Sequence, residues 1–192
     1  MYKGMHVAVV IPAKDEEEHI GNVLATIPEF VDRVVVVNDG SKDNTAKLVK
    51  NADLIQLEGE GVGAAIDAGH QHLLRVLEDD FISVVMAGDG QMDPDDMEGL
   101  IEPIICGKAH HVKGERLDRA GKMPVIRRFG TLLLSLLTTL ACGQSIRDAQ
   151  CGYTATCSRV LNSWNWKKSW KGYGYPNWWL MQLSEKGWKV AH

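Results

Sequence analysis

The chain has 192 residues, of which 45% are hydrophobic and 24% charged, and its formal net charge at pH 7 is -4. This length allows one α/β domain with a full hydrophobic core. Because no basic surface is indicated, we expect no nucleic-acid partner. The four cysteines form no CxxC pair and no zinc-type spacing with histidine, which indicates free thiols in a reducing cytoplasm.

The first half of the chain alternates short apolar runs with helical patterns, which predicts βαβ units and a mainly parallel sheet. Strands are expected at His6–Pro12, Arg33–Asn38, Asp53–Leu57, Phe81–Met86 and His110–Gly114. Asp15 is expected to cap a helix that runs to Ile27, and Asp93 to cap another that starts at Pro94. The second half is less regular, and we interpret residues 1–192 as a single domain.

An apolar segment, Phe129–Ile146, follows a basic stretch that contains Lys122, Arg127 and Arg128. Since a membrane span needs about 20 predominantly apolar residues, this shorter and more polar segment predicts a packed helix. A basic flank beside an apolar helix also suits an anionic membrane surface, so a peripheral contact at the cytoplasmic face of a membrane is the second interpretation.

The two ends of the chain add two expectations. The N-terminal residues lack the pattern of a signal peptide, which indicates a cytoplasmic protein. The last residues, KGWKVAH, read as the opening of a strand, so we expect a catalytic region that is truncated at its C-terminus.

Acidic residues follow three of the expected strands. Asp15 and Glu16 follow the first, Asp39 the second and Asp89 the fourth. In a parallel sheet these strand ends share one edge, so the acids should converge on one crevice. Such a cluster is tolerated when a cation or N–H donors lie among the carboxylates. Asp89 and Gln91 offer hard oxygen ligands for Mg²⁺ or Mn²⁺, whose open positions would accept a diphosphate.

Asp39 could also read a nucleobase. A carboxylate accepts the imide N–H of uracil or guanine, a group that adenine lacks, and such a charge-assisted bond is about twice as strong as a neutral one. This favours UDP or GDP over ATP. The same segment, NDGSKDNT, is also typical of an Asx turn followed by a helix cap.

Six segments occur in one order: VVIPAKDEEEHI, VVVNDGSKDNT, GVGAAIDAG, VVMAGDGQMDP, VKGERL and IRDAQCGYTA. In this order they resemble family-2 glycosyltransferases, and most of all the polyprenyl-phosphate (dolichol-phosphate) mannosyl- and glucosyltransferase branch. The resemblance extends from His6 to His192. It implies a GT-A (nucleotide-diphosphosugar transferase) fold, which is a Rossmann-like α/β architecture with helices flanking a mainly parallel sheet. It also implies inversion at the sugar carbon and dependence on a divalent metal.

The resemblance also implies residue roles. The nucleotide-binding positions are Pro12, Ala13, Glu16, Asp39, Gly63 and Gly88. The metal ligands are Asp89 and Gln91. The catalytic positions are Asp89, Arg116, Asp148 and Gln150. Arg116 would meet phosphate, while Asp148, Gln150 and Gly152 would line the sugar and acceptor side. Arg127 and Arg128 are candidates for the acceptor phosphate, although a solvated basic loop is an equally good interpretation.

Three positions depart from the family pattern. Ala87 replaces the first acid of the D-x-D motif, Asp15 stands where Asn is usual, and Val62 replaces a common Lys. We expect these changes to alter nucleotide choice or affinity rather than the reaction class.

The predicted function is transfer of mannose or glucose from a UDP- or GDP-sugar to a polyprenyl or dolichyl phosphate, with inversion and with Mg²⁺ or Mn²⁺. One alternative is a sugar hydroxyl acceptor, for which Asp148 would be the base. Another is a catalytically degenerate nucleotide-binding module, which Ala87 and Val62 would suit. A dinucleotide fingerprint at residues 59–64 follows the third strand rather than the first, which disfavours NAD binding.

Overall fold

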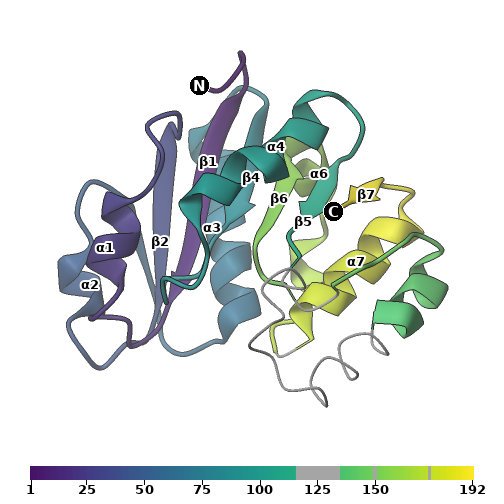
Figure 1. Cartoon of the computed structure of the whole chain (residues 1–192). Helices are drawn as coiled ribbons and strands as arrows, with labels where there is room; N and C mark the ends of the chain where they lie inside the picture. Colours follow the sequence, from purple (N-terminus) through teal and green to yellow (C-terminus); the bar gives the residue numbers. More distant parts are fainter. Residues whose placement is uncertain (116–134, 149–150, 173) are drawn as a thin grey trace, which may run out of the picture.

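The computed structural model describes residues 1–115, 135–148, 151–172 and 174–192. Within them, one seven-stranded sheet runs through the molecule with helices on both faces (Figure 1). Its strand order is β3-β2-β1-β4-β6-β5-β7. The strands are β1 (His6–Ala13), β2 (Arg33–Asp39), β3 (Asp53–Leu57), β4 (Phe81–Val85), β5 (His111–Lys113), β6 (Thr154–Cys157) and β7 (Val190–Ala191).

Most neighbouring strands are parallel, as the alternating sequence pattern predicts. β1 pairs in parallel with β2 and with β4, and β2 pairs in parallel with β3. β6 is the exception, because it is antiparallel to both β4 and β5. The sequence did not predict β6, since its four residues, TATC, are too few for a clear strand pattern.

The described helices include one segment without a label, residues 135–142. The others are α1 (Ile20–Ala25), α2 (Thr45–Leu48), α3 (Val62–Val76), the 3-10 turn η1 (Pro94–Asp96), α4 (Met97–Ile105), α6 (Ser158–Asn162), η3 (Trp166–Lys168) and α7 (Tyr175–Glu185). None of the described helices is long and apolar enough to cross a membrane. The start of the expected apolar segment, residues 129–134, lies outside the described residues.

Side chains of β1 alternate between two hydrophobic cores, as the two-residue period of a strand requires. Val7, Val9 and Ile11 join the core that contains residues of α1 and α4, whereas Ala8 and Val10 join the core built with α3, α6 and α7. All five are fully buried. The continuous apolar run of the first strand is therefore explained by helices that cover both faces of the sheet.

The chain order around β1 determines where a ligand can bind. From β1 the chain continues to β2 and β3 on one side, and α3 then carries it across to β4 on the other side of β1. In open α/β sheets, ligands bind outside the carboxyl ends of the strands where the order reverses in this way. The crevice at the ends of β1 and β4 is therefore the expected binding site.

Two helix starts were predicted, and one prediction was wrong. Asp93 caps η1 as expected, because its carboxylate accepts the N–H of Asp95 at 3.1 Å. Asp15 does not cap a helix: its φ is 55°, and α1 begins only at Ile20. The amides that follow Asp15 bond to another loop instead, as described below.

A cluster of aromatic rings surrounds His70 in the α3, α6 and α7 core. The His70 ring lies 6.0 Å from that of Trp166 and 5.9 Å from that of Trp179. Neither of its nitrogens has a hydrogen-bond partner among the described residues. Complete burial lowers the pKa of His70 to about 3, so the folded protein keeps this ring neutral.

This burial predicts a dependence of stability on pH. Below pH ~6.5 the unfolded chain takes up a proton at His70 that the folded chain refuses until pH about 3. Stability should therefore fall as the pH drops through this window. His70→Leu should reduce the loss in unfolding free energy between pH 7 and pH 5 by about 2 kcal/mol, measured by urea unfolding at both pH values.

The exposed Leu54 does not titrate and supplies the control, since Leu54→Ala should leave the loss unchanged. Burial also lowers the pKa of His111 well below its usual value, so part of the acid sensitivity should persist in the His70 variant. If the unfolding free energy of His70→Leu fell with pH as much as that of the unmodified protein, the buried ring of His70 would not be the source of the loss.

Candidate active site

Two loops at the carboxyl ends of β1 and β2 hold each other by hydrogen bonds. The N–H of Asp15 donates to Ser41 Oγ at 2.9 Å, and Asp15 Oδ1 accepts the N–H of Lys42 at 2.7 Å. The left-handed backbone of Asp15 turns these groups toward the second loop. The carboxylate of Asp15 therefore organises the loops rather than capping α1.

The next residues extend this contact. The N–H of Glu17 donates to Asp43 Oδ2 at 3.0 Å, while Glu17 Oε2 accepts the N–H of Asn44 at 2.9 Å. The N–H of Glu16 donates to Thr45 Oγ1 at 2.7 Å. Three successive amides thus find acceptors outside a helix, which explains the late start of α1.

Asp39, at the end of β2, is buried and holds the loop between β3 and α3. Its Oδ1 accepts the N–H of Glu60 at 2.7 Å, and its Oδ2 accepts the N–H of Gly61 at 2.9 Å. A Cβ on Gly40 would lie 2.9 Å from the nitrogen of Gly59, so these two loops touch through glycine backbone. Each oxygen of an ionised carboxylate has a second lone-pair site, which leaves Asp39 able to accept from a ligand as well.

The loop after β4 lies directly against the end of β1. The N–H of Gly88 donates to the carbonyl of Pro12 at 3.2 Å, and a Cβ on Gly88 would lie 3.1 Å from that of Ala13. Asp89 Oδ1 accepts the N–H of Gln91 at 3.0 Å in a local turn. The structure therefore brings the predicted positions of these two segments together.

Glu16 and Asp89 form the acidic part of this crevice. Partial burial raises the pKa of the Glu16 carboxyl, and the negative charge of Asp89 raises it further. A carboxyl group whose pKa is raised by a neighbouring carboxylate fits a site for a cation, and the hard oxygens of both residues suit Mg²⁺ or Mn²⁺. No three His, Cys, Asp or Glu side chains of the described residues group into a metal site. A bound ion would therefore need ligand or water oxygens.

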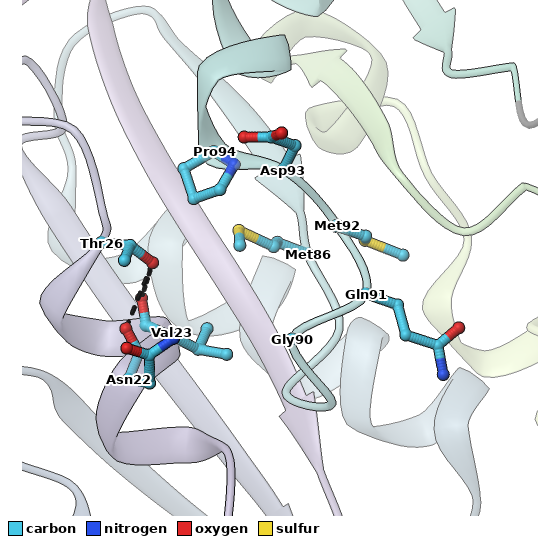
Figure 2. A pocket seen from close by; sticks show the side chains of 9 residues that line it. All are labelled: Asn22, Val23, Thr26, Met86, Gly90, Gln91, Met92, Asp93 and Pro94. Carbon is cyan, nitrogen blue, oxygen red and sulfur yellow. Dashed lines mark hydrogen bonds between the residues drawn. The ribbon is translucent and has the colours of Figure 1, made fainter. Parts of the chain in front are cut away.

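A pocket of about 210 Å³ lies beside this loop, between α1 and the residues that follow Asp89 (Figure 2). It is lined by Asn22, Val23, Thr26, Met86, Gly90, Gln91, Met92, Asp93 and Pro94. In Figure 2 the Gln91 side chain points away from the α1 residues. Glu16 and Asp39 do not line this pocket, but Gln91, a predicted metal ligand, does.

The segment before β6 is fixed by two buried charged residues. Asp148 Oδ1 accepts the N–H of Cys151 at 3.1 Å, and Lys113 Nζ donates to the carbonyl of the same residue. Next along the chain, a Cβ on Gly152 would lie 3.4 Å from Met92 Cε. Met92 in turn accepts the N–H of Ala87 at 3.2 Å. Residues 151–152 therefore lie beside the Asp89 loop.

The predicted site residues divide into four groups. Pro12, Ala13, Glu16, Gly88, Asp89 and Gln91 lie together at the ends of β1 and β4. Asp148 lies before β6, where it bonds to the N–H of Cys151. Asp39 and Gly63 belong to the adjoining β2 end and the start of α3. Arg116, Arg127, Arg128 and Gln150 lie outside the described residues.

Sequence reasoning missed several polar residues around the site. Besides Lys113, the most notable is Asp67, which is buried in α3 and accepts the Tyr175 hydroxyl at 2.7 Å. One signal was available for Asp67. Its neighbours GAA and AG predict that one face of the helix packs closely, so a carboxylate within them suggests a buried partner.

Comparison with solved structures defines the class of fold. Glucosyl-3-phosphoglycerate synthase from Mycobacterium tuberculosis, solved with Mn²⁺, UDP-glucose and phosphoglyceric acid, matches with a TM-score of 0.73. The match covers 98% of this chain and 69% of that chain, at 23% sequence identity. The predicted GT-A fold is confirmed.

Sequence comparison gives the family. The model of glycosyl transferase family 2 matches residues 8–184. UDP-N-acetylglucosamine–dolichyl-phosphate N-acetylglucosaminyltransferase of Methanococcus voltae is 32% identical over 179 residues, which cover 81% of this chain and 70% of that protein. Dolichyl-phosphate β-glucosyltransferase of Trichomonas vaginalis is also 32% identical, over 78% of this chain and 51% of that protein. The chain therefore belongs to glycosyl transferase family 2, and it is a nucleotide-sugar glycosyltransferase, as predicted.

The hydrogen bonds of Asp39 lead to a prediction about stability. Asp39→Ala leaves the amides of Glu60 and Gly61 without their acceptor, which should lower the free energy of unfolding by about 1–3 kcal/mol. Urea unfolding would measure the change. Asp79→Ala, which removes a carboxylate that is 85% exposed, is the matched control and should change stability little. Equal stability of the two variants would show that Asp39 does not hold the loop.

Proposed function

We propose that the protein transfers a hexose, glucose or mannose, from a UDP- or GDP-sugar to a polyprenyl or dolichyl phosphate, with inversion and with Mg²⁺ or Mn²⁺. The proposal rests on the proximity of Glu16 and Asp89, together with the loop between β3 and α3 that Asp39 holds. The names of two relatives, which use a dolichyl phosphate, support this acceptor, and UDP in one of those names favours UDP over GDP.

In this proposal the nucleotide lies over the carboxyl ends of β1 and β2. Asp39 accepts the imide N–H of the base with the lone pairs that the Glu60 and Gly61 amides leave available. Pro12, Ala13 and Gly88 offer close backbone approach to the nucleotide. Glu16, Asp89 and Gln91 would hold the divalent ion. When bound, such an ion supplies positive charge that stabilises the departing diphosphate.

The acceptor phosphate oxygen attacks the anomeric carbon from the side opposite the diphosphate. A new C–O bond forms as the bond to the diphosphate breaks, and its electron pair leaves with the nucleoside diphosphate. Because the attacking phosphate is already an anion, positioning is required rather than a strong base. Arg116 would stabilise phosphate charge, and Gln150 would line the acceptor side. Arg127 and Arg128 would hold the acceptor phosphate.

The environment of Asp148 favours a phosphate acceptor over a sugar hydroxyl. Only 1% of Asp148 is exposed, and one of its oxygens already accepts the N–H of Cys151. A general base has to reach the hydroxyl proton that it removes. We therefore assign Asp148 a positioning role, in which it fixes Cys151.

A donor-binding screen tests the proposal. UDP-glucose, UDP-N-acetylglucosamine and GDP-mannose are each added with Mn²⁺, with Mg²⁺ or with chelator, and the shift in Tm is measured. A true donor at 100 times its Kd should stabilise the fold by about 2.7 kcal/mol. Asp89→Asn should remove the part of the shift that depends on metal, whereas Asp79→Ala should retain it. A screen in which no sugar nucleotide shifts Tm would contradict the proposal.

Turnover separates catalysis from binding alone. Incubation with the best donor and a polyprenyl phosphate should yield a lipid-linked sugar, detected by extraction into organic solvent. Ala87, which replaces the first acid of the metal motif, suits a degenerate module as the second candidate. Donor binding without transfer to lipid phosphate or to a sugar hydroxyl would favour that candidate.

The helical residues 135–142 support a contact with the membrane that contains such an acceptor. Leu136, Leu137 and Leu140 are 56%, 55% and 71% exposed, while Ser135 and Thr138 are buried. The leucines of this helix therefore face outward, and its buried residues are polar. A helix on a water-exposed surface has the reverse arrangement. A lipid surface offers these leucines an apolar environment, and the preceding basic residues of the sequence suit anionic headgroups.

Replacement of Leu136, Leu137 and Leu140 by Ser should weaken binding to vesicles of anionic and zwitterionic phospholipid, measured by co-sedimentation. Loss of three partly inserted leucines should reduce the bound fraction at least about tenfold. Val76→Ser changes an exposed apolar residue of α3 and should have no effect. Undiminished binding of the triple variant would refute the membrane contact.

A further inference from the structure

The chain between η3 and α7 passes directly over the start of α3. A Cβ on Gly61 would lie 2.9 Å from the carbonyl oxygen of Lys171. A Cβ on Gly63 would lie 2.7 Å from Cδ2 of Tyr175 and 2.8 Å from the carbonyl oxygen of Trp170. Glycine at these two positions therefore allows residues 170, 171 and 175 to rest on the loop and on the first turn of α3.

One buried hydrogen bond holds this arrangement. The Tyr175 hydroxyl donates to Asp67 Oδ1 at 2.7 Å, and the two residues are only 4% and 3% exposed. The Tyr175 ring also stacks on Trp179, with centroids 5.8 Å apart. Burial raises the pKa of Asp67, and the hydroxyl partly opposes this effect by stabilising the carboxylate. The pair thus joins the first residue of α7 to the middle of α3.

The loop under this segment is also the one that Asp39 holds. Asp39 accepts the N–H groups of Glu60 and Gly61, while Lys171 packs against Gly61 and places its Nζ 4.0 Å from Glu60. The loop is therefore clamped between the end of β2 and the chain that leads into α7. Neither clamp includes a residue at the reacting centre of the proposed transfer.

We propose that Tyr175 is a positioning residue for the donor nucleotide. Through its hydrogen bond to Asp67, Tyr175 holds residues 170–171 and its own ring against Gly61 and Gly63. This contact keeps residues 59–63 in the conformation in which the N–H groups of Glu60 and Gly61 donate to Asp39. This inference rests on the proposed function, because it takes that loop as part of the donor site. A loop that is correctly formed only part of the time lowers apparent affinity by that fraction, whereas the chemical step after binding is unchanged.

Steady-state kinetics with the donor varied, together with the Kd of UDP by calorimetry, test the inference. Tyr175→Phe removes only the hydroxyl and should raise donor KM and UDP Kd about three- to tenfold, with kcat within about twofold of the unmodified protein. Asp67→Asn retains an acceptor oxygen for the hydroxyl and should stay near the original values. Asp67→Leu removes the acceptor and should behave like Tyr175→Phe.

The matched control is Tyr2→Phe, which removes another tyrosine–carboxylate bond, the 3.1 Å contact with Glu98, in an exposed part of the protein. It should leave KM and Kd unaltered. Hydrogen exchange gives an independent readout: amides of residues 60–63 should exchange faster in Tyr175→Phe than in Tyr2→Phe, with no ligand present. Should Tyr175→Phe not fold, Asp67→Leu breaks the same hydrogen bond from the other partner and should raise KM in the same way.

The outcomes distinguish this inference from the proposed function. Nucleotide binding by the unmodified protein with unchanged Kd in Tyr175→Phe would overturn the inference alone. A fall in kcat at constant KM, or an Asp67→Asn variant as impaired as Asp67→Leu, would also overturn it. Failure of the unmodified protein to bind any nucleoside diphosphate would refute the proposed function and the donor role of Tyr175 with it.

Discussion

Backbone N–H groups at the carboxyl ends of the strands need acceptors, and acidic side chains provide them. Asp15 accepts the N–H of Lys42, Asp39 those of Glu60 and Gly61, and Asp89 that of Gln91. Each of these acids lies at or after the end of a parallel strand. Asp89 fixes its own loop, whereas Asp15 holds the loop after β2 and Asp39 holds the loop after β3. The shape of the crevice therefore depends on carboxylates that the sequence assigns to ligand binding, Asp39 and Asp89, and on Asp15, which precedes the predicted site residue Glu16.

Glu16 differs from these acids, because its backbone N–H rather than its carboxylate takes part in the contact between the loops. Its carboxyl is partly buried beside Asp89, and both features raise its pKa. A divalent cation held by the two residues would oppose this rise in the pKa of Glu16, since nearby positive charge favours the ionised form of a carboxyl group. The electrostatic arrangement of the crevice is therefore complementary to a cation-bound diphosphate, in keeping with a family of nucleotide-sugar transferases.

Sequence patterns predicted the features that depend on local burial. The apolar runs located β1 to β5, and the parallel order placed Glu16, Asp39 and Asp89 at one edge. The prediction for Asp15 was wrong because its partners lie in residues 41–42, in a loop that competes with the helix for the same amides. A capping pattern in the sequence cannot reveal such competition, since only the folded chain brings the two loops together.

The contacts that escaped prediction join residues that lie far apart in the sequence. Asp67 and Tyr175 are 108 residues apart, and Lys113 reaches the carbonyl of Cys151 across 38 residues. Buried polar groups must be paired, but a sequence does not say with which partner. These pairings give the two halves different tasks: the first supplies the acidic strand ends, and the second fixes the loops around them. In the proposed function, donor affinity should therefore depend on residues that never touch the donor, because α7 holds the loop that bonds to Asp39, the acid proposed to read the base.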